Sequence, residues 1–142
     1  MRSKIFLLIV LASFWLVNST RGQDAPGIKF FTGTLQEALA KAKQEKKLVF
    51  FDAYASWCGP CKNMKATVFT DATLGEFFNA NFISIGIDME KGEGPNLSKI
   101  FTSIDGYPSL LFLDAEGHVI KTLLGSRSIE ALLGEARLAK MR

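Results

Sequence analysis

Apolar and polar residues alternate along the chain with two different periods, and the period predicts which segments are helices and which are strands. From residue 34 to 46 the apolar positions recur at helical spacing, with charged residues between them. Thr34 and Glu37 have the spacing of a capping box, which marks the start of a helix. Further helices are expected at residues 58 to 69 with a restart at Asp71, at residues 95 to 101, and after Ser128.

Four other segments have the composition of strands. Leu48 to Phe51 is a continuous apolar run within residues 47 to 55, as expected of a strand buried on both faces. Residues 82 to 88 alternate apolar with small residues, and residues 109 to 114 and 118 to 124 flank an Ala-Glu-Gly turn. Because parallel crossover units followed by a C-terminal hairpin require a mixed sheet, we expect a three-layer α/β/α domain with a mixed central sheet.

The first residues resemble an export signal. Arg2 and Lys4 precede a largely apolar run from Ile5 to Val17, and small and polar residues follow, as in a secretory signal peptide. The run is shorter than the roughly 20 apolar residues of a spanning helix, so an uncleaved membrane anchor is the less favoured alternative. We expect cleavage near Ser19 or Gly22, a signal peptide at residues 1–22 and a single domain at residues 23–142.

Removal of this leader changes the charge of the protein. The chain has 17 Lys and Arg against 14 Asp and Glu, a formal charge of +3. Arg2, Lys4 and Arg21 lie in the leader, so the remaining domain has 14 of each and a net charge of zero. Such a domain has no charge excess to attract nucleic acid or an anionic membrane, and neither is expected as a partner.

The two cysteines of the chain, Cys58 and Cys61, lie together in the stretch ASWCGPCK. A structural zinc site needs four ligands, and the chain adds only His118, which we expect to be a solvated hairpin residue, so no metal is expected. A purely structural disulfide here would close a very short loop, which stabilises a fold by only about 2 kcal/mol in the chain-entropy model. A working redox pair is the third and preferred interpretation.

The redox interpretation accounts for every residue of the motif. Cys58 is expected where a buried strand ends and a helix begins, so unpaired N–H groups and the helix dipole would lower the pKa of its thiol. Cys61 lies one turn further in, where it is more shielded than an exposed Cys58 and can attack a mixed disulfide. Gly59 allows a tight turn, and Pro60 suits the first turn of a helix.

This motif resembles the active site of the thioredoxin family, and of its secreted members in particular. The resemblance extends from about Lys29 to the C-terminus. It implies the thioredoxin fold and a Cys58–Cys61 disulfide in the oxidised state. It also implies thiol–disulfide oxidoreductase activity, with Cys58 as the nucleophile and Cys61 as the resolving cysteine.

Asp52 lies six residues before Cys58, where the family keeps a buried acidic residue. Burial would raise the pKa of its carboxyl group, and the resemblance implies that Asp52 relays a proton to or from Cys61. The alternative is a strand-end aspartate paired with the backbone or a lysine. Cytosolic members usually carry a lysine near this aspartate, but the matching position here is Ser84, so that partner is missing.

Gly106-Tyr107-Pro108-Ser109 resembles the cis-proline loop of the family, with an ordinary turn as the alternative. Gly125 matches a family glycine that lets a substrate backbone pass closely. Trp57 is expected half-exposed beside the thiols, rather than in the core. The substrate-binding residues implied by the resemblance are Trp57, Gly59, Pro60, Tyr107, Pro108 and Gly125.

Residues 68 to 94 differ from cytosolic thioredoxins and are similar to thioredoxin domains of transmembrane thiol–disulfide interchange proteins and of secreted bacterial proteins. A periplasmic protein-disulfide oxidoreductase is therefore expected. The Gly-Pro dipeptide between the cysteines resembles the reducing members, so a reductase is preferred over an oxidase or isomerase. The alternatives are a non-catalytic binding module and a reductase dedicated to one client, such as one in metal delivery or cytochrome maturation.

The expected partners follow from this chemistry. They are protein disulfides as substrates and a membrane thiol reductase as the electron donor. The chain has no glycine-rich dinucleotide loop, so it is not expected to bind NADPH or flavin directly, and no cofactor is expected. A monomer is expected.

Overall fold

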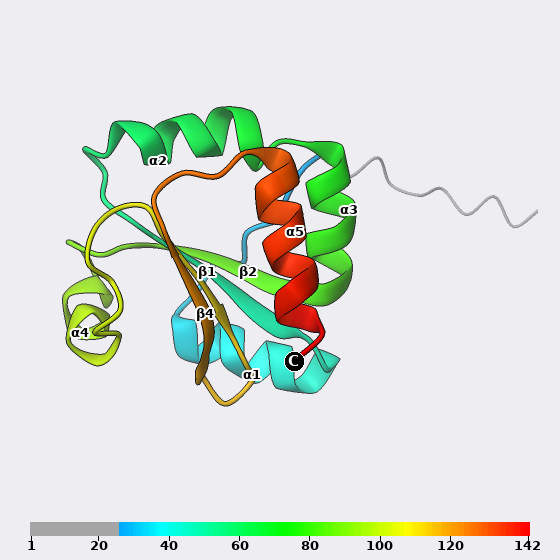
Figure 1. Ribbon diagram of the computed structural model, residues 1–142. Helices are drawn as coiled ribbons and strands as arrows, with labels where there is room; N and C mark the ends of the chain where they lie inside the picture. Colours follow the sequence, from blue (N-terminus) through cyan, green and yellow to red (C-terminus); the bar gives the residue numbers. More distant parts are fainter. Residues whose placement is uncertain (1–25) are drawn as a thin grey trace, which may run out of the picture.

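A four-stranded mixed sheet forms the centre of the computed structural model, which describes residues 26–142 (Figure 1). The strand order is β2-β1-β3-β4, with β1 parallel to β2 and antiparallel to β3, and β3 antiparallel to β4. The predicted α/β fold with a mixed central sheet is therefore confirmed, whereas the predicted signal peptide lies outside the described residues. The strands are β1 (Leu48–Tyr54), β2 (Phe82–Asp88), β3 (Ser109–Leu113) and β4 (Val119–Leu124).

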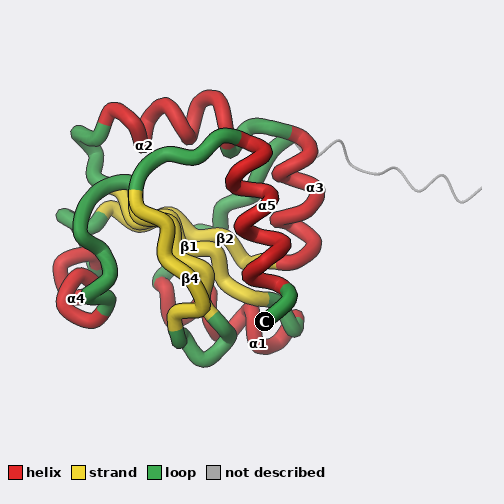
Figure 2. The backbone as a smooth tube through the Cα atoms, viewed as in Figure 1, coloured by secondary structure: helices red, strands yellow, loops and turns green. Residues whose placement is uncertain are grey.

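Helices cover both faces of the sheet, and Figure 2 shows the sheet between them. Side chains of α3 and α5, and of the helical segment after Cys58, pack on one face. Side chains of α1 and α4 pack on the other face. The four helices named here are α1 (Leu35–Glu45), α3 (Ala72–Asn81), α4 (Gly94–Ile100) and α5 (Ile129–Lys140).

The central strand β1 supplies the core of both faces, as its continuous apolar run predicts. Phe50 and Phe51 are both fully buried, and successive residues of a strand point to opposite faces. The Phe50 ring lies 4.9 Å from that of Phe78 and 5.3 Å from that of Phe112, within an aromatic cluster on the α3 and α5 side. Phe51 contacts Phe101 at 5.7 Å on the opposite side.

Side-chain caps fix where three of the helices begin. The Glu37 N–H donates to Thr34 Oγ1 at 3.2 Å, and Glu37 Oε2 accepts the Thr34 N–H at 2.8 Å, so the predicted capping box is present. Asp71 caps α3 by accepting the Leu74 N–H, and Ser128 caps α5 by accepting the Ala131 N–H.

The helix predicted from residue 58 to 69 has two parts. It begins as α2 (Gly59–Asn63) and continues as a π-helix, η1 (Met64–Val68). The wider turn is visible in the Phe69 N–H, which donates to the carbonyl of Met64 at 2.8 Å. It places both Val68 and Phe69 in the core before α3 begins.

The N-terminal segment 26–31 runs along the outer edge of β2, which the sequence did not predict. The Phe31 N–H donates to the carbonyl of Ser84 at 2.7 Å, and Phe30 forms a parallel bridge with Ser84. The segment is also tied to the helices, because the Ile28 N–H donates to the carbonyl of Phe69 at 2.7 Å. It protects an otherwise open sheet edge. Across residues 26–142 no helix is long and apolar enough to span a membrane.

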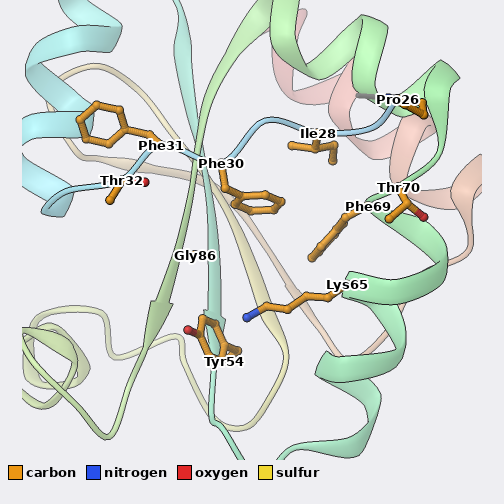
Figure 3. A pocket seen from close by; sticks show the side chains of 10 residues that line it. All are labelled: Pro26, Ile28, Phe30, Phe31, Thr32, Tyr54, Lys65, Phe69, Thr70 and Gly86. Atoms are coloured by element: carbon orange, nitrogen blue, oxygen red, sulfur yellow. The ribbon is translucent and has the colours of Figure 1, made fainter. Parts of the chain in front are cut away.

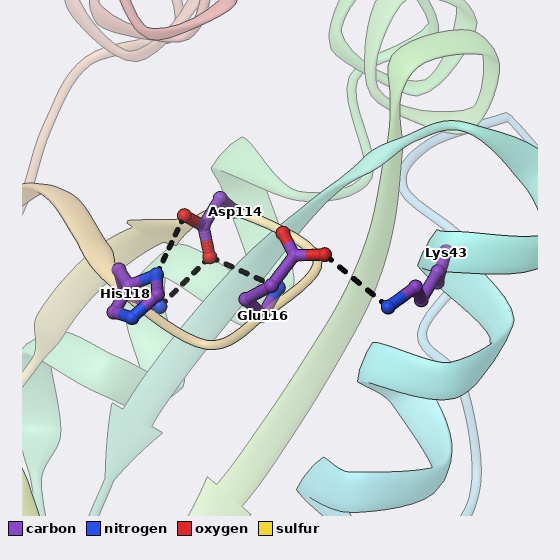
Figure 4. Close-up of polar contacts among 4 residues, drawn as sticks. All are labelled: Lys43, Asp114, Glu116 and His118. Carbon is purple, nitrogen blue, oxygen red and sulfur yellow. Dashed lines mark hydrogen bonds and ion pairs between the residues drawn. The ribbon is translucent and has the colours of Figure 1, made fainter.

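The turn between β3 and β4 carries the only histidine of the chain, as predicted. His118 is exposed, and its Nδ1 lies 2.9 Å from Asp114 Oδ2 (Figure 4). Glu116 of the same turn forms an ion pair with Lys43 of α1 at 3.4 Å. These surface contacts order the hairpin and lie outside the site described next.

Candidate active site

The end of β1 and the start of α2 position the two cysteines. After Tyr54 the chain makes a short turn, closed by a hydrogen bond of 3.1 Å from the Cys58 N–H to the carbonyl of Ala55. Cys58 is the N-cap of α2, and its Sγ accepts the Cys61 N–H at 3.1 Å. The two cysteines form a disulfide, with their Cα atoms 5.3 Å apart. The sulfur of Cys58 therefore lies at the positive end of a helical segment, where a thiolate is favoured.

The exposure predicted for Cys58 is wrong for this oxidised state. Each cysteine keeps only 2 % of its surface exposed, so Cys61 is no better shielded than Cys58. The physical reason is that the disulfide draws the Cys58 sulfur towards the first turn of α2, where Ala55 and Tyr107 pack against the pair.

Trp57 lies on the surface beside the disulfide, 65 % exposed, so it is not a core residue. Its indole N–H donates to Glu90 Oε1 at 2.9 Å, and its ring makes an edge contact with Tyr107 at 6.0 Å. Glu90 follows β2 and was not identified from the sequence. Only the three-dimensional fold brings it near a residue 33 positions earlier.

The Gly106–Ser109 loop lies at the same end of the sheet. The Tyr107–Pro108 peptide bond is cis, in agreement with the resemblance. Ser109 pairs with Ala53 of β1, which places Pro108 near the cysteines, and Tyr107 packs directly against them. The Gly125 N–H donates to the carbonyl of Pro108 at 2.8 Å, and its φ of +83° is a conformation that glycine adopts readily.

The structure thus gathers the residues that the sequence singled out at one end of the sheet. Gly59 and Pro60 form the exposed first turn of α2. A Cβ added at Gly59 would have no other atom within 4 Å, so the space beside it is open. Across the described residues, no group of three or more His, Cys, Asp or Glu side chains is placed to hold a metal ion.

Asp52 is buried in β1, with 1 % of its surface exposed. Within the described structure neither carboxylate oxygen has a hydrogen-bond partner, so the alternative of a paired structural aspartate is not what is found. Burial raises the pKa of this carboxyl group to about 7, and the positive charge of Lys65 lowers the pKa in part.

The lysine that cytosolic members carry on the neighbouring strand is absent, as the sequence indicated. Asp52 pairs in register with Gly86. Ser84, two residues before Gly86 in β2, pairs with Phe50. A cation comes instead from η1, where Lys65 places its Nζ 3.3 Å from the centre of the Tyr54 ring (Figure 3). Lys65 was not identified from the sequence as a neighbour of Asp52, because its position relative to β1 depends on the fold.

Comparisons with known proteins agree with this geometry. A family profile described as Thioredoxin-like matches residues 31–115, more than half of the chain. The thiol:disulfide interchange protein DsbD of Vibrio vulnificus is 26 % identical over 113 residues, which cover 76 % of this chain and 19 % of that protein. The chain therefore spans about a fifth of the length of this relative.

Two further proteins are similar over most of their own length. Thioredoxin H4 of Arabidopsis thaliana is 34 % identical over 88 residues, covering 62 % of this chain and 68 % of that protein. A solution structure from Bacteroides thetaiotaomicron, provisionally named a disulphide-isomerase, is 40 % identical, with a TM-score of 0.71. The match covers 82 % of this chain and 95 % of that one. The fold, the Cys58–Cys61 disulfide and these matches together show that the chain belongs to the thioredoxin-like family.

Proposed function

We propose that this protein is a thiol–disulfide oxidoreductase that acts on protein disulfides outside the cytoplasm. The observation that carries the proposal is the Cys58–Cys61 disulfide at the start of a helical segment, with the Cys61 N–H directed at the Cys58 sulfur. That arrangement favours a thiolate at Cys58 in the reduced protein and keeps the second thiol within reach.

The reaction transfers two electrons from the dithiol to the substrate. The Cys58 thiolate attacks one sulfur of a substrate disulfide, and the other substrate sulfur leaves as a thiolate that takes a proton from water. The Cys61 thiol then gives its proton to the Asp52 carboxylate. Its sulfur attacks Cys58, which forms the Cys58–Cys61 disulfide and releases the second substrate thiolate. Asp52 finally returns its proton to water.

The residues around the disulfide form the proposed substrate surface. Trp57 and Tyr107 supply aromatic contact area beside the sulfurs. The Tyr107–Pro108 segment and Gly125 offer backbone to an extended substrate chain, and a side chain at Gly125 would narrow its path. Gly59 and Pro60 leave the approach to Cys58 free of bulky side chains.

We infer a periplasmic reductase with a leader at residues 1–22 and one domain at residues 23–142. The sequence of the leader and the similarity to thiol:disulfide interchange proteins support this location. A membrane thiol reductase would return the protein to its dithiol form by supplying two electrons and two protons. The protein acts as a monomer and takes its electrons from this dithiol donor, not directly from NADPH or flavin.

The test is disulfide reduction by the purified protein and two cysteine variants. With a dithiol donor present, the wild type is expected to reduce insulin disulfides, and Cys58→Ser is expected to be inactive. Cys61→Ser is expected to accumulate a mixed disulfide through Cys58, visible as a shift in mass that a reductant reverses. If Cys58→Ser reduced insulin as fast as the wild type, the reduction would not come from the cysteine pair. The protein would then be a non-catalytic module.

A disulfide isomerase is the second candidate, because the structural relative at 40 % identity carries that name. In an isomerase, another thiolate of the substrate attacks the mixed disulfide and displaces Cys58 as a thiolate, so that a new substrate disulfide forms without net electron transfer. In a reductase, Cys61 displaces the substrate thiolate instead. Recovery of scrambled ribonuclease by the pre-reduced dithiol protein, with no further reductant, would favour the isomerase, and rapid insulin reduction without such recovery would favour the reductase.

A further inference from the structure

The two outer strands of the sheet end on either side of the redox pair. Strands β2 and β4 both run parallel to β1, because β3 is antiparallel to β1 and to β4, so all three end at the same edge of the sheet (Figure 1). The register aligns one row of residues across the four strands, made of Ile87, Ala53, Ser109 and Leu124. The segments that follow β2 and β4 therefore flank the cysteines that follow β1, and the ends of this row are about 14 Å apart.

The two flanking segments carry opposite charges. Glu90 follows β2, and one oxygen of its carboxylate accepts the indole N–H of Trp57. Arg127 follows β4 and is half-buried. Between Glu90 and the strand, Lys91 and Asp88 form an ion pair at 3.6 Å, so their charges offset each other. The proposed substrate surface thus has an acidic end beside β2 and a basic end beside β4.

The loop after β4 holds the guanidinium group of Arg127 in place. Its Nη1 donates to three consecutive carbonyls, those of Leu124, Gly125 and Ser126, at 3.0, 3.1 and 2.9 Å. Across residues 26–142 this side chain makes no other hydrogen bond and no ion pair, with Asp105 of the loop before β3 included. A guanidinium group has five N–H donors and stays charged in proteins, so the donors on Nε and Nη2 remain available.

The same guanidinium group borders the open face of Gly125. Apart from the chain neighbours of Gly125, a Cβ placed there would have one atom within 4 Å, Arg127 Nη1 at 3.9 Å. The Gly125 N–H donates to the carbonyl of Pro108, and Tyr107 packs against the cysteines. From β1 to β4 the distance is two strand spacings, which an extended chain covers in about three residues. A substrate chain that runs from Cys58 across this loop therefore reaches the guanidinium group.

We propose that Arg127 determines substrate specificity, by selecting chains that carry Asp or Glu about three residues from the reacting cysteine, on the side that faces β4. This inference rests on the proposed function, because it uses the same disulfide and the same substrate surface. The free N–H groups of Arg127 bind the substrate carboxylate through charge-assisted hydrogen bonds. Glu90 repels the same carboxylate at the other end, so the preference depends on which side of the cysteine the acidic residue lies.

The test uses short peptides joined as disulfide-linked dimers through one central cysteine. Each peptide carries Glu or Gln three positions before the cysteine, or three positions after it. The readout is the second-order rate constant for reduction by the pre-reduced protein, from the peptide thiol released. We expect the wild type to reduce one of the two Glu peptides about threefold faster than its Gln counterpart, as for an exposed ion pair, and the other Glu peptide no faster. Salt at about 0.5 M should remove the difference by screening.

Substitutions of Arg127 separate specificity from a structural role. Arg127→Gln should reduce the Glu and Gln peptides at equal rates, and Arg127→Lys, which keeps the charge, should retain the preference. If Arg127 only fixed the loop, Arg127→Gln would slow all peptides by the same factor and leave the ratio of their rates unchanged.

Two other cations serve as controls. Arg137→Gln makes the same substitution in the last turn of α5, where the guanidinium group lies 5.8 Å from the centre of the Phe77 ring. Lys62→Gln removes the exposed lysine that follows Cys61 in α2. Both variants should keep the preference of the wild type.

The outcomes separate this specificity from the function. A wild type without a preference, or a preference that persists in Arg127→Gln, would overturn the role of Arg127 while leaving the oxidoreductase intact. Loss of the preference in Lys62→Gln or Arg137→Gln would also overturn it. A wild type that reduces neither the peptides nor insulin would overturn the proposed function itself.

Discussion

Asp52→Asn is expected to stabilise the oxidised protein at neutral and alkaline pH. The carboxyl group has a pKa of about 7 in the folded protein, against 3.8 as its ordinary value. A difference of about three units corresponds to about 4 kcal/mol, because each unit is worth 1.36 kcal/mol. Asparagine removes the charge at nearly constant shape. It leaves an amide without partners, so part of the gain is offset.

The direction of the pH dependence follows from the raised pKa. The folded protein binds the proton of Asp52 more tightly than the unfolded chain does, so the contribution of this group is fully present below pH 3.8. It is lost as the pH rises through about 7. The difference in the free energy of unfolding between Asp52→Asn and the wild type should therefore grow between about pH 4 and pH 7 and stay constant above that.

Urea unfolding of the oxidised proteins from pH 4 to pH 9 measures this difference. Asp105→Asn, at an exposed aspartate, is the control for a general change in charge. If the stability of Asp52→Asn ran parallel to that of the wild type at all pH values, the buried carboxyl group would not be protonated in the folded state, and the proposed relay would lose its basis.

Three further substitutions test the fold that holds the site. Phe78→Ala should reduce the free energy of unfolding by about 3–5 kcal/mol in urea, because it empties the aromatic cluster around Phe50; a loss below 1 kcal/mol would contradict that packing. Thr34→Ala should cost about 1 kcal/mol in the same assay by removing the cap of α1, and no loss would mean that the cap is absent in solution. Gly75→Ala should destabilise the protein, because its Cβ would overlap the backbone of Gly27. Hydrogen exchange should then show the N-terminal segment losing protection, and unchanged exchange would place that segment elsewhere.

The features that the sequence predicted depend on short stretches of chain. The capping box at Thr34 spans four residues, and the redox motif from Trp57 to Cys61 spans five. Leu48 to Phe51 identified the central strand because burial on both faces excludes polar residues over a continuous run. Each of these signals is complete within a few consecutive residues, so each could be recognised without knowledge of the fold.

The features that were missed depend on contacts between distant segments. The pairing of residues 26–31 with β2 joins positions more than 50 apart, and Glu90 reaches Trp57 from another loop. The low exposure of Cys58 depends on Tyr107, which lies 49 positions further along the chain. Lys65 could not be placed near Asp52 because the π-helical turn, which sets its orientation, leaves no local signature.

The reduction potential of the Cys58–Cys61 pair tests the central claim most directly. The purified protein would be equilibrated against dithiol or glutathione buffers of known potential, and the fraction of disulfide would be measured by mass after alkylation. A reductase is expected to have a potential below about −230 mV, close to that of the reducing members of the family. A value above about −160 mV would contradict this account and make the protein an oxidant of folding proteins.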